Sequence, residues 1–152
     1  ESFLTARGLQ AQLDWSLGRA NPRQAAKIGQ MLSDFNGLKV VAAHHPLVAP
    51  GGLHGRAKTH GGREAAEIFA QCGVDLVVTG HLHQVFALPQ RRPDGKACWF
   101  VGAGTALSHR TRGEPPSFNL FEHSLEGLSL TVYAAQDGEN RFAPIKTQAL
   151  HG

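Results

Sequence analysis

Two short apolar segments limit the folds that this 152-residue chain can adopt. Residues 38–43 (LKVVAA) and 74–79 (VDLVVT) have the length and composition of strands buried inside a sheet. Between them, residues 63–72 carry apolar side chains at helical spacing and end before Gly73. A strand, a helix and a second strand in this order form a right-handed crossover between parallel strands. The sequence therefore predicts an α/β fold built around a parallel pair.

The flanking segments extend this unit. Upstream, Asn21 and Pro22 are residue types typical of an N-cap and a first helical position, and apolar residues follow at helical spacing up to Gly37. Downstream, four more apolar segments alternate with turn signals, and short connections favour antiparallel pairing. These segments are residues 85–88, 97–101, 117–123 and 128–134. We expect an α/β domain with a mixed β-sheet and flanking helices.

Composition excludes several other classes of protein. With 41% hydrophobic and 18% charged residues, the chain is not of the disordered type. Its longest apolar run, residues 97–101, is too short to cross a membrane as a helix. Two cysteines cannot form a disulfide framework, so we expect a reducing compartment and a cytoplasmic location. The net charge of +3 permits anionic ligands, but without a dense basic run or a series of aromatics it does not predict a nucleic-acid partner.

Four of the nine histidines stand directly after the two buried segments. They are His44 and His45 after the first segment, and His81 and His83 after the second. Parallel strands end at the same edge of a sheet, which is where open α/β sheets bind ligands. Residues two apart in extended chain face the same side, so His81 and His83 are expected to share one site. Gly80 is expected to allow a close approach of the backbone. Histidine at such an edge indicates a metal site or a proton carrier.

At these two motifs the chain resembles the calcineurin-like metallophosphoesterases. In that family one apolar strand ends in His-His-Pro and a later one in Gly-His-x-His, and these strand ends supply metal ligands. Residues 40–47 (VVAAHHPL) and 77–83 (VVTGHLH) match both patterns. Residues 104–105 and 114–119 are similar to the closing strands of the family. The chain resembles in particular the bacterial branch that hydrolyses cyclic nucleotides and glycerophosphodiesters.

The motifs of the first half of that family do not occur in this sequence. These are Asp-x-His, Gly-Asp and Gly-Asn-His-(Asp/Glu), which supply a bridging aspartate, further ligands and the general acid. Residues 1–152 therefore resemble the C-terminal part of a single metallophosphoesterase domain, contributing about one sheet of a four-layer α-β-β-α sandwich. A half-fold of this kind leaves a sheet face and an edge uncovered, which predicts pairing with a missing N-terminal half or tight self-association.

The resemblance also implies roles for individual histidines. His44 and His81 would bind one metal, and His83 would bind the other of two divalent ions, drawn from Mn, Fe, Zn, Co or Ni. The implied activity is that of a metal-dependent phosphohydrolase, specifically a phosphodiesterase that uses a two-metal-activated hydroxide on a phosphoester substrate. Three imidazoles without a carboxylate are a poor two-metal site, so we expect the isolated chain to be inactive and assign it no catalytic residue. The alternative is a non-catalytic remnant or interaction module.

Further cationic side chains are candidates for substrate contact, with solvated surface charge as the alternative. His45 either holds its loop or contacts the substrate. The other candidates lie in the long loop after residue 44 or follow residue 105, and they are His54, Arg56, His60, His109, Arg110 and Arg112. His123 and His151 are expected to be structural or exposed, and Trp99 to fill the core.

Overall fold

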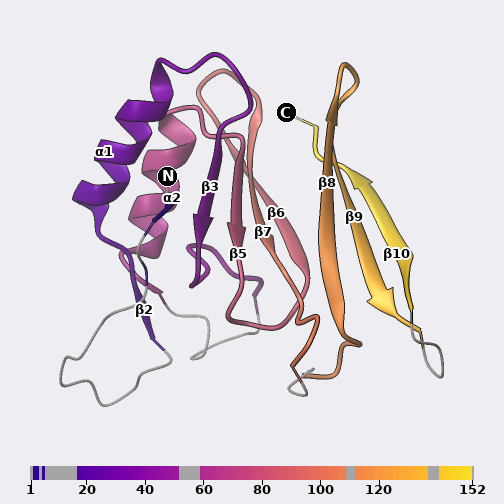
Figure 1. The fold of residues 1–152 in the computed structure, drawn as a ribbon. Coiled ribbons are helices and arrows are strands. Elements are labelled where there is room, and N and C mark those ends of the chain that lie inside the picture. Colours follow the sequence, from indigo (N-terminus) through magenta and orange to yellow (C-terminus); the bar gives the residue numbers. More distant parts are fainter. Residues whose placement is uncertain are drawn as a thin grey trace.

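The computed structural model of the protein describes residues 2–3, 5, 17–51, 59–108, 112–136 and 141–151. This part of the chain forms three layers (Figure 1). Two helices cover one face of a five-stranded mixed sheet, and a three-stranded antiparallel sheet faces the other side. The expected α/β class and mixed sheet are confirmed. No described helix is long and apolar enough to cross a membrane.

The five-stranded sheet contains the predicted crossover. Its strands, in spatial order, are β1 (Ser2–Phe3), β3 (Val40–Ala43), β5 (Leu76–Thr79), β7 (Ala97–Gly102) and β6 (Phe86–Arg91). Strands β3, β5 and β7 are parallel neighbours, while β6 is antiparallel to β7. The register sets Ala43 opposite Thr79, so β3 and β5 end level with each other. A separate parallel pair joins β2 (Gly18–Arg19) to β4 (Thr59–His60).

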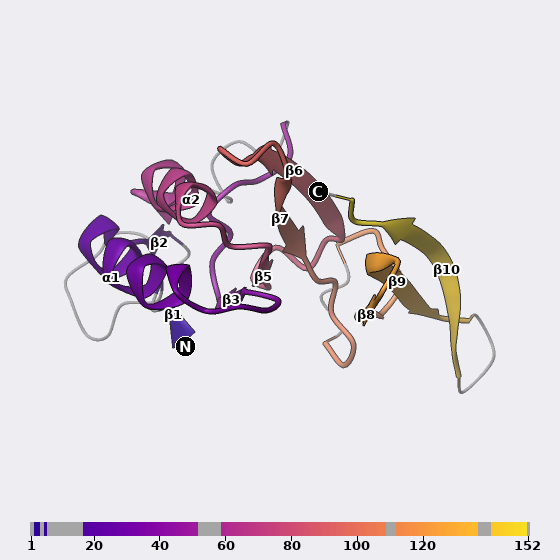
Figure 2. The same cartoon turned by 90° about the horizontal axis from the view of Figure 1, so that it is seen from above.

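Both helices lie on the same side of this sheet (Figure 2). Helix α1 (Pro22–Ser33) begins as predicted, with the Asn21 side chain accepting a hydrogen bond from the Arg23 backbone N–H at 3.0 Å. Helix α2 (Gly62–Gln71) buries Phe69 completely against the sheet. The predicted extension of the first helix towards Gly37 is wrong, since α1 ends at Ser33 and leaves Phe35 55% exposed.

The second sheet shows that the chain contributes more than one sheet, contrary to expectation. It consists of β8 (Ser117–Ser124), β9 (Gly127–Ala135) and β10 (Phe142–Ala149), in the order β10-β9-β8. Its inner side chains, including Leu130 and Val132, pack against Leu76 and Val101 of the first sheet. The apolar face of an alternating strand such as β9 is buried only when another layer packs against it. Apolar segments in the sequence do not reveal which sheet a strand joins.

Within the described part of the chain, one face of β3 is only partly covered. Strand β3 was predicted to be buried on both faces, but Val40 is 39% exposed. An apolar cleft of about 490 Å³ lies between strands β3, β5 and β7 on one side and β8 on the other. The burial of β3 therefore comes from the helices on one side only.

Candidate metal centre

Three histidine side chains meet at the carboxyl edge of the five-stranded sheet. His44 and His45 follow β3 directly, and His81 lies two residues after β5. Their ring nitrogens offer three ligand atoms that all lie within 4.8 Å of one another. Nδ1 of His81 is 3.3 Å from Nε2 of His44. The level ends of two parallel strands thus place His44 and His81 together, as the sequence predicts.

A tight turn holds His81 in this position. The Gly80 N–H donates to the His44 carbonyl at 3.1 Å, and the Leu82 N–H donates to the Gly80 carbonyl at 2.7 Å. The second bond closes a three-residue turn around His81, whose φ is 65°, and His83 also has a positive φ of 55°. Such backbone conformations cost a non-glycine residue on the order of 1 kcal/mol and are concentrated at functional sites.

The turn corrects two predictions. His81 and His83 do not lie in an extended chain, because β5 ends at Thr79 and both residues have positive φ angles. The structure does not bring His83 into the histidine group, and its role as a second-metal ligand stays a prediction. Gly80 is not a point of close approach either, since a Cβ there would be 4.0 Å from its nearest neighbour, the His44 carbonyl oxygen.

His45 is the buried member of the histidine group. It is 5% exposed, its N–H donates to Thr5 Oγ1 at 2.8 Å, and its Nδ1 is 3.3 Å from the same oxygen. Gly18 packs so closely that a Cβ there would lie 2.5 Å from His45 Cβ. Burial, followed by the charges of His81 and His44, lowers the pKa of His45 to about 4. The ring is therefore neutral at pH 7 and keeps a lone pair for a ligand.

Three residues that support this site were not predicted from the sequence: Thr5, Gly18 and Glu114. Thr5 and Gly18 lie in a segment without clear periodicity, so nothing in the sequence connects them to His45. Glu114 belongs to the segment similar to the family's closing strands, and its carboxylate accepts a hydrogen bond from the Val85 N–H at 2.9 Å. This contact anchors the chain just after His83.

The donor set fits a divalent transition metal. Neutral imidazoles suit Zn, Ni, Co or Fe, and the three ring nitrogens are already close together. In the part of the chain that the structure describes, no carboxylate joins this group. The described residues therefore offer imidazole nitrogen alone.

Of the candidate substrate contacts, His45 lies in the histidine group, and the structure describes two of the others, His60 and Arg112. His60 lies in β4 and is exposed, and its carbonyl accepts a hydrogen bond from the Ala20 N–H. Arg112 is also exposed, with a positive φ of 51°. The remaining candidates, His54, Arg56, His109 and Arg110, lie outside the described residues.

Comparison with known proteins identifies the family. The family model described as calcineurin-like phosphoesterase matches residues 3–85, more than half of the chain. The chain belongs to the calcineurin-like phosphoesterases. The matched segment of this phosphoesterase chain contains His44, His45, His81 and His83 and ends before β6.

This calcineurin-like phosphoesterase chain was also compared with solved structures and with curated proteins. Among solved structures it is similar to wild-type Vps29 from Entamoeba histolytica, crystallised in complex with Zn²⁺, at 15% sequence identity and a TM-score of 0.37. That comparison covers 95% of this chain and 96% of the other. No match was found among curated proteins.

Proposed function

We propose that this calcineurin-like phosphoesterase chain binds a divalent transition metal through His44 and His81 and serves the hydrolysis of a phosphodiester. The observation that carries the proposal is the approach of the His44, His45 and His81 ring nitrogens to within 4.8 Å at one edge of the sheet. The family match over residues 3–85 supports a phosphoester as the substrate.

The residues of the chain would hold the metal in a defined place. Bound here, the metal would supply Lewis-acid chemistry, stabilising the charge that develops on a phosphoryl oxygen. His44 and His81 each present an imidazole from a strand end, and the turn around His81 limits the directions that its ring can take. Thr5 fixes the His45 ring from behind, so geometry favours His45 as the third ligand. His83 remains our candidate for a second ion.

A complete two-metal site needs carboxylates as well. The resemblance assigns these to the first half of the family domain, so we propose that a further polypeptide segment or a second copy of the chain completes the site. The apolar cleft beside β3 and the exposed Val40 support such a contact, because exposed apolar surface of this kind is typical of interfaces.

A second candidate function is a metal-binding or interaction module without catalysis. The observation that favours it is the imidazole-only donor set among the described residues. Such a module would bind zinc and present the sheet edge to a partner without hydrolysing phosphoesters.

An activity assay separates the two candidates. Two samples are compared: the full product of the natural gene and the 152-residue chain. Each is loaded with Mn²⁺ or Zn²⁺ and assayed with bis(p-nitrophenyl) phosphate. We expect turnover only in the natural product, with a loss of about 100-fold or more in His81→Ala. Metal binding without turnover in the natural product would support the non-catalytic module. Turnover by the 152-residue chain alone, abolished by His81→Ala, would show that it needs no further segment.

A further inference from the structure

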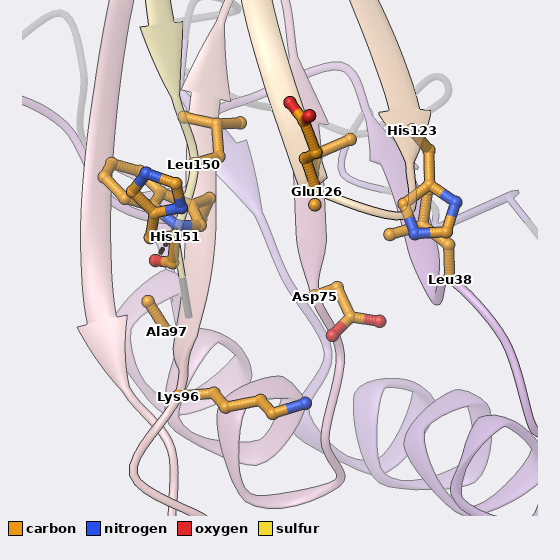
Figure 3. A pocket seen from close by; sticks show the side chains of 11 residues that line it. Leu38, Asp75, Lys96, Ala97, His123, Glu126, Leu150 and His151 are labelled. Atoms are coloured by element: carbon orange, nitrogen blue, oxygen red, sulfur yellow. Dashed lines mark hydrogen bonds between the residues drawn. The ribbon is translucent and has the colours of Figure 1, made fainter.

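A second pocket lies at the opposite edge of the five-stranded sheet. Strands β3, β5 and β7 begin at this edge, whereas the histidine group lies where β3 and β5 end. The pocket has a volume of about 320 Å³, within the range of small-molecule sites. It is closed on its other side by the β8–β9 turn and by the residues after β10 (Figure 3). The family match ends at residue 85, so most of the pocket comes from outside the matched segment.

Three basic side chains line this pocket: Lys96, His123 and His151. They come from three separate parts of the chain, just before β7, near the end of β8 and after β10. Among the residues that the structure describes, none of the three forms an ion pair with an acidic side chain. The Lys96 ammonium group and the two imidazoles are therefore able to donate hydrogen bonds to a ligand.

Of the two carboxylates of the pocket, Asp75 is ion-paired and Glu126 points away from Lys96 (Figure 3). Asp75 is an ion-pair partner of Arg92, whose side chain is 9% exposed, and it also accepts a hydrogen bond from the Lys39 N–H at 2.9 Å. The negative charge of Asp75 is thus partly compensated from within the fold, since Arg92 also pairs with Asp94. Figure 3 shows the Glu126 carboxylate pointing away from Lys96 and Asp75. Lys96 therefore forms no ion pair with either carboxylate of the pocket, and its charge interacts with that of Asp94 outside the pocket.

One wall of the pocket is aromatic and fixed in position. Trp99 is half-buried, and its indole N–H donates to the His151 carbonyl at 3.0 Å. Leu128 and Leu150 add apolar surface beside it. Trp99 packs against the apolar side chains between the two sheets, as expected. It also borders this pocket. A fixed indole beside leucine side chains suits the aromatic or apolar part of a ligand.

From these features we propose that the pocket binds a small organic anion that carries an aromatic group. The anionic end contacts Lys96, assisted by the two imidazoles, and the aromatic end packs against Trp99. This site is separate from the histidine group, since Asp75 precedes β5 and His81 follows it. The proposal requires neither a metal nor phosphoesterase activity.

Fluorescence of Trp99 tests the proposal directly. The chain has two tryptophans, so a Trp15→Phe variant reports on Trp99 alone. It is titrated with phenylacetate and, in parallel, with the uncharged analogue 2-phenylacetamide. We expect a saturable fluorescence change with phenylacetate and affinity for the amide weaker by about tenfold, the effect of one charge-assisted hydrogen bond. Isothermal titration calorimetry of the unmodified chain repeats both titrations without relying on the Trp15 variant.

Matched lysine variants locate the binding site. We expect Lys96→Gln to weaken phenylacetate binding by about tenfold and Lys27→Gln, which removes an exposed lysine of α1, to leave it unchanged. Circular dichroism confirms that both variants are folded. The proposal is overturned by equal responses to acid and amide, by undiminished binding in Lys96→Gln, or by the absence of saturable binding in both methods.

Discussion

At the scale of single residues, the fold changes the protonation of His45 strongly. Its side chain is buried beside Thr5, and burial together with His81 and His44 lowers its pKa from 6.5 to about 4. Between these two pH values the unfolded chain binds a proton that the folded chain does not bind. The free energy of unfolding therefore falls as the pH drops through this window, by up to about 3 kcal/mol from this residue.

Urea unfolding in the presence of a chelator measures this effect, at about pH 7 and about pH 4.5. We expect His45→Gln to show a smaller decrease in stability between the two pH values than the parent, because the glutamine does not titrate. Identical pH dependence in both proteins would contradict the assignment to His45.

Glycine is required at position 18 because His45 occupies the space that a side chain there would need. A Cβ at Gly18 would lie 2.5 Å from Cβ and Cγ of His45, whereas a Cβ at Gly51 meets no described residue within 4 Å. We expect Gly18→Ala to lower the free energy of unfolding by about 1–3 kcal/mol and to weaken metal binding, because the ring must move. Gly51→Ala is the matched control, and an equal effect of both substitutions would show that the contact is unimportant.

At the level of secondary-structure elements, a charged cluster fastens the amino edge of the sheet. Asp75, just before β5, pairs with Arg92 after β6 and accepts the N–H of Lys39 before β3. Arg92 also pairs with Asp94 at 2.6 Å, but Asp94 is 46% exposed. Breaking a pair that leaves a buried charge behind is costly, whereas an exposed pair contributes little.

Asparagine substitutions compare the two carboxylates. We expect Asp75→Asn to lower the free energy of unfolding by about 2–3 kcal/mol and Asp94→Asn by less than about 1 kcal/mol. Urea denaturation of both variants at neutral pH gives the two values. A loss in Asp94→Asn as large as that in Asp75→Asn would contradict the account.

Across the whole molecule, the features that depend on local sequence pattern could be predicted from the sequence. The parallel pair, the two helices and the meeting of His44 with His81 follow from apolar periodicity and from strand ends that lie level. The predicted strand ends at Thr79 as observed, but nothing in the residues Gly80 to His83 specifies the positive φ angles of His81 and His83, so the backbone turn was not foreseeable. The contact of His45 with Thr5 joins residues 40 positions apart, and only tertiary structure shows it.

The layered arrangement also determines what the chain offers a partner. The second sheet covers the part of the first sheet that includes Leu76 and Val101, while the cleft beside β3 stays open. The histidine group lies at the carboxyl edge of the same layer, so a segment that covers the cleft would also come near it. We therefore expect that one partner segment would both cover the cleft and complete the site at the histidine group.

The most direct test of the metal centre is calorimetric titration of the purified chain with Zn²⁺. We expect one ion per chain, a loss of affinity of about 100-fold in His81→Gln, and no loss in His83→Gln or in the exposed control His60→Gln. Zinc affinity that survives His81→Gln, or that is lost in His83→Gln alone, would contradict a metal centre formed by His44, His45 and His81.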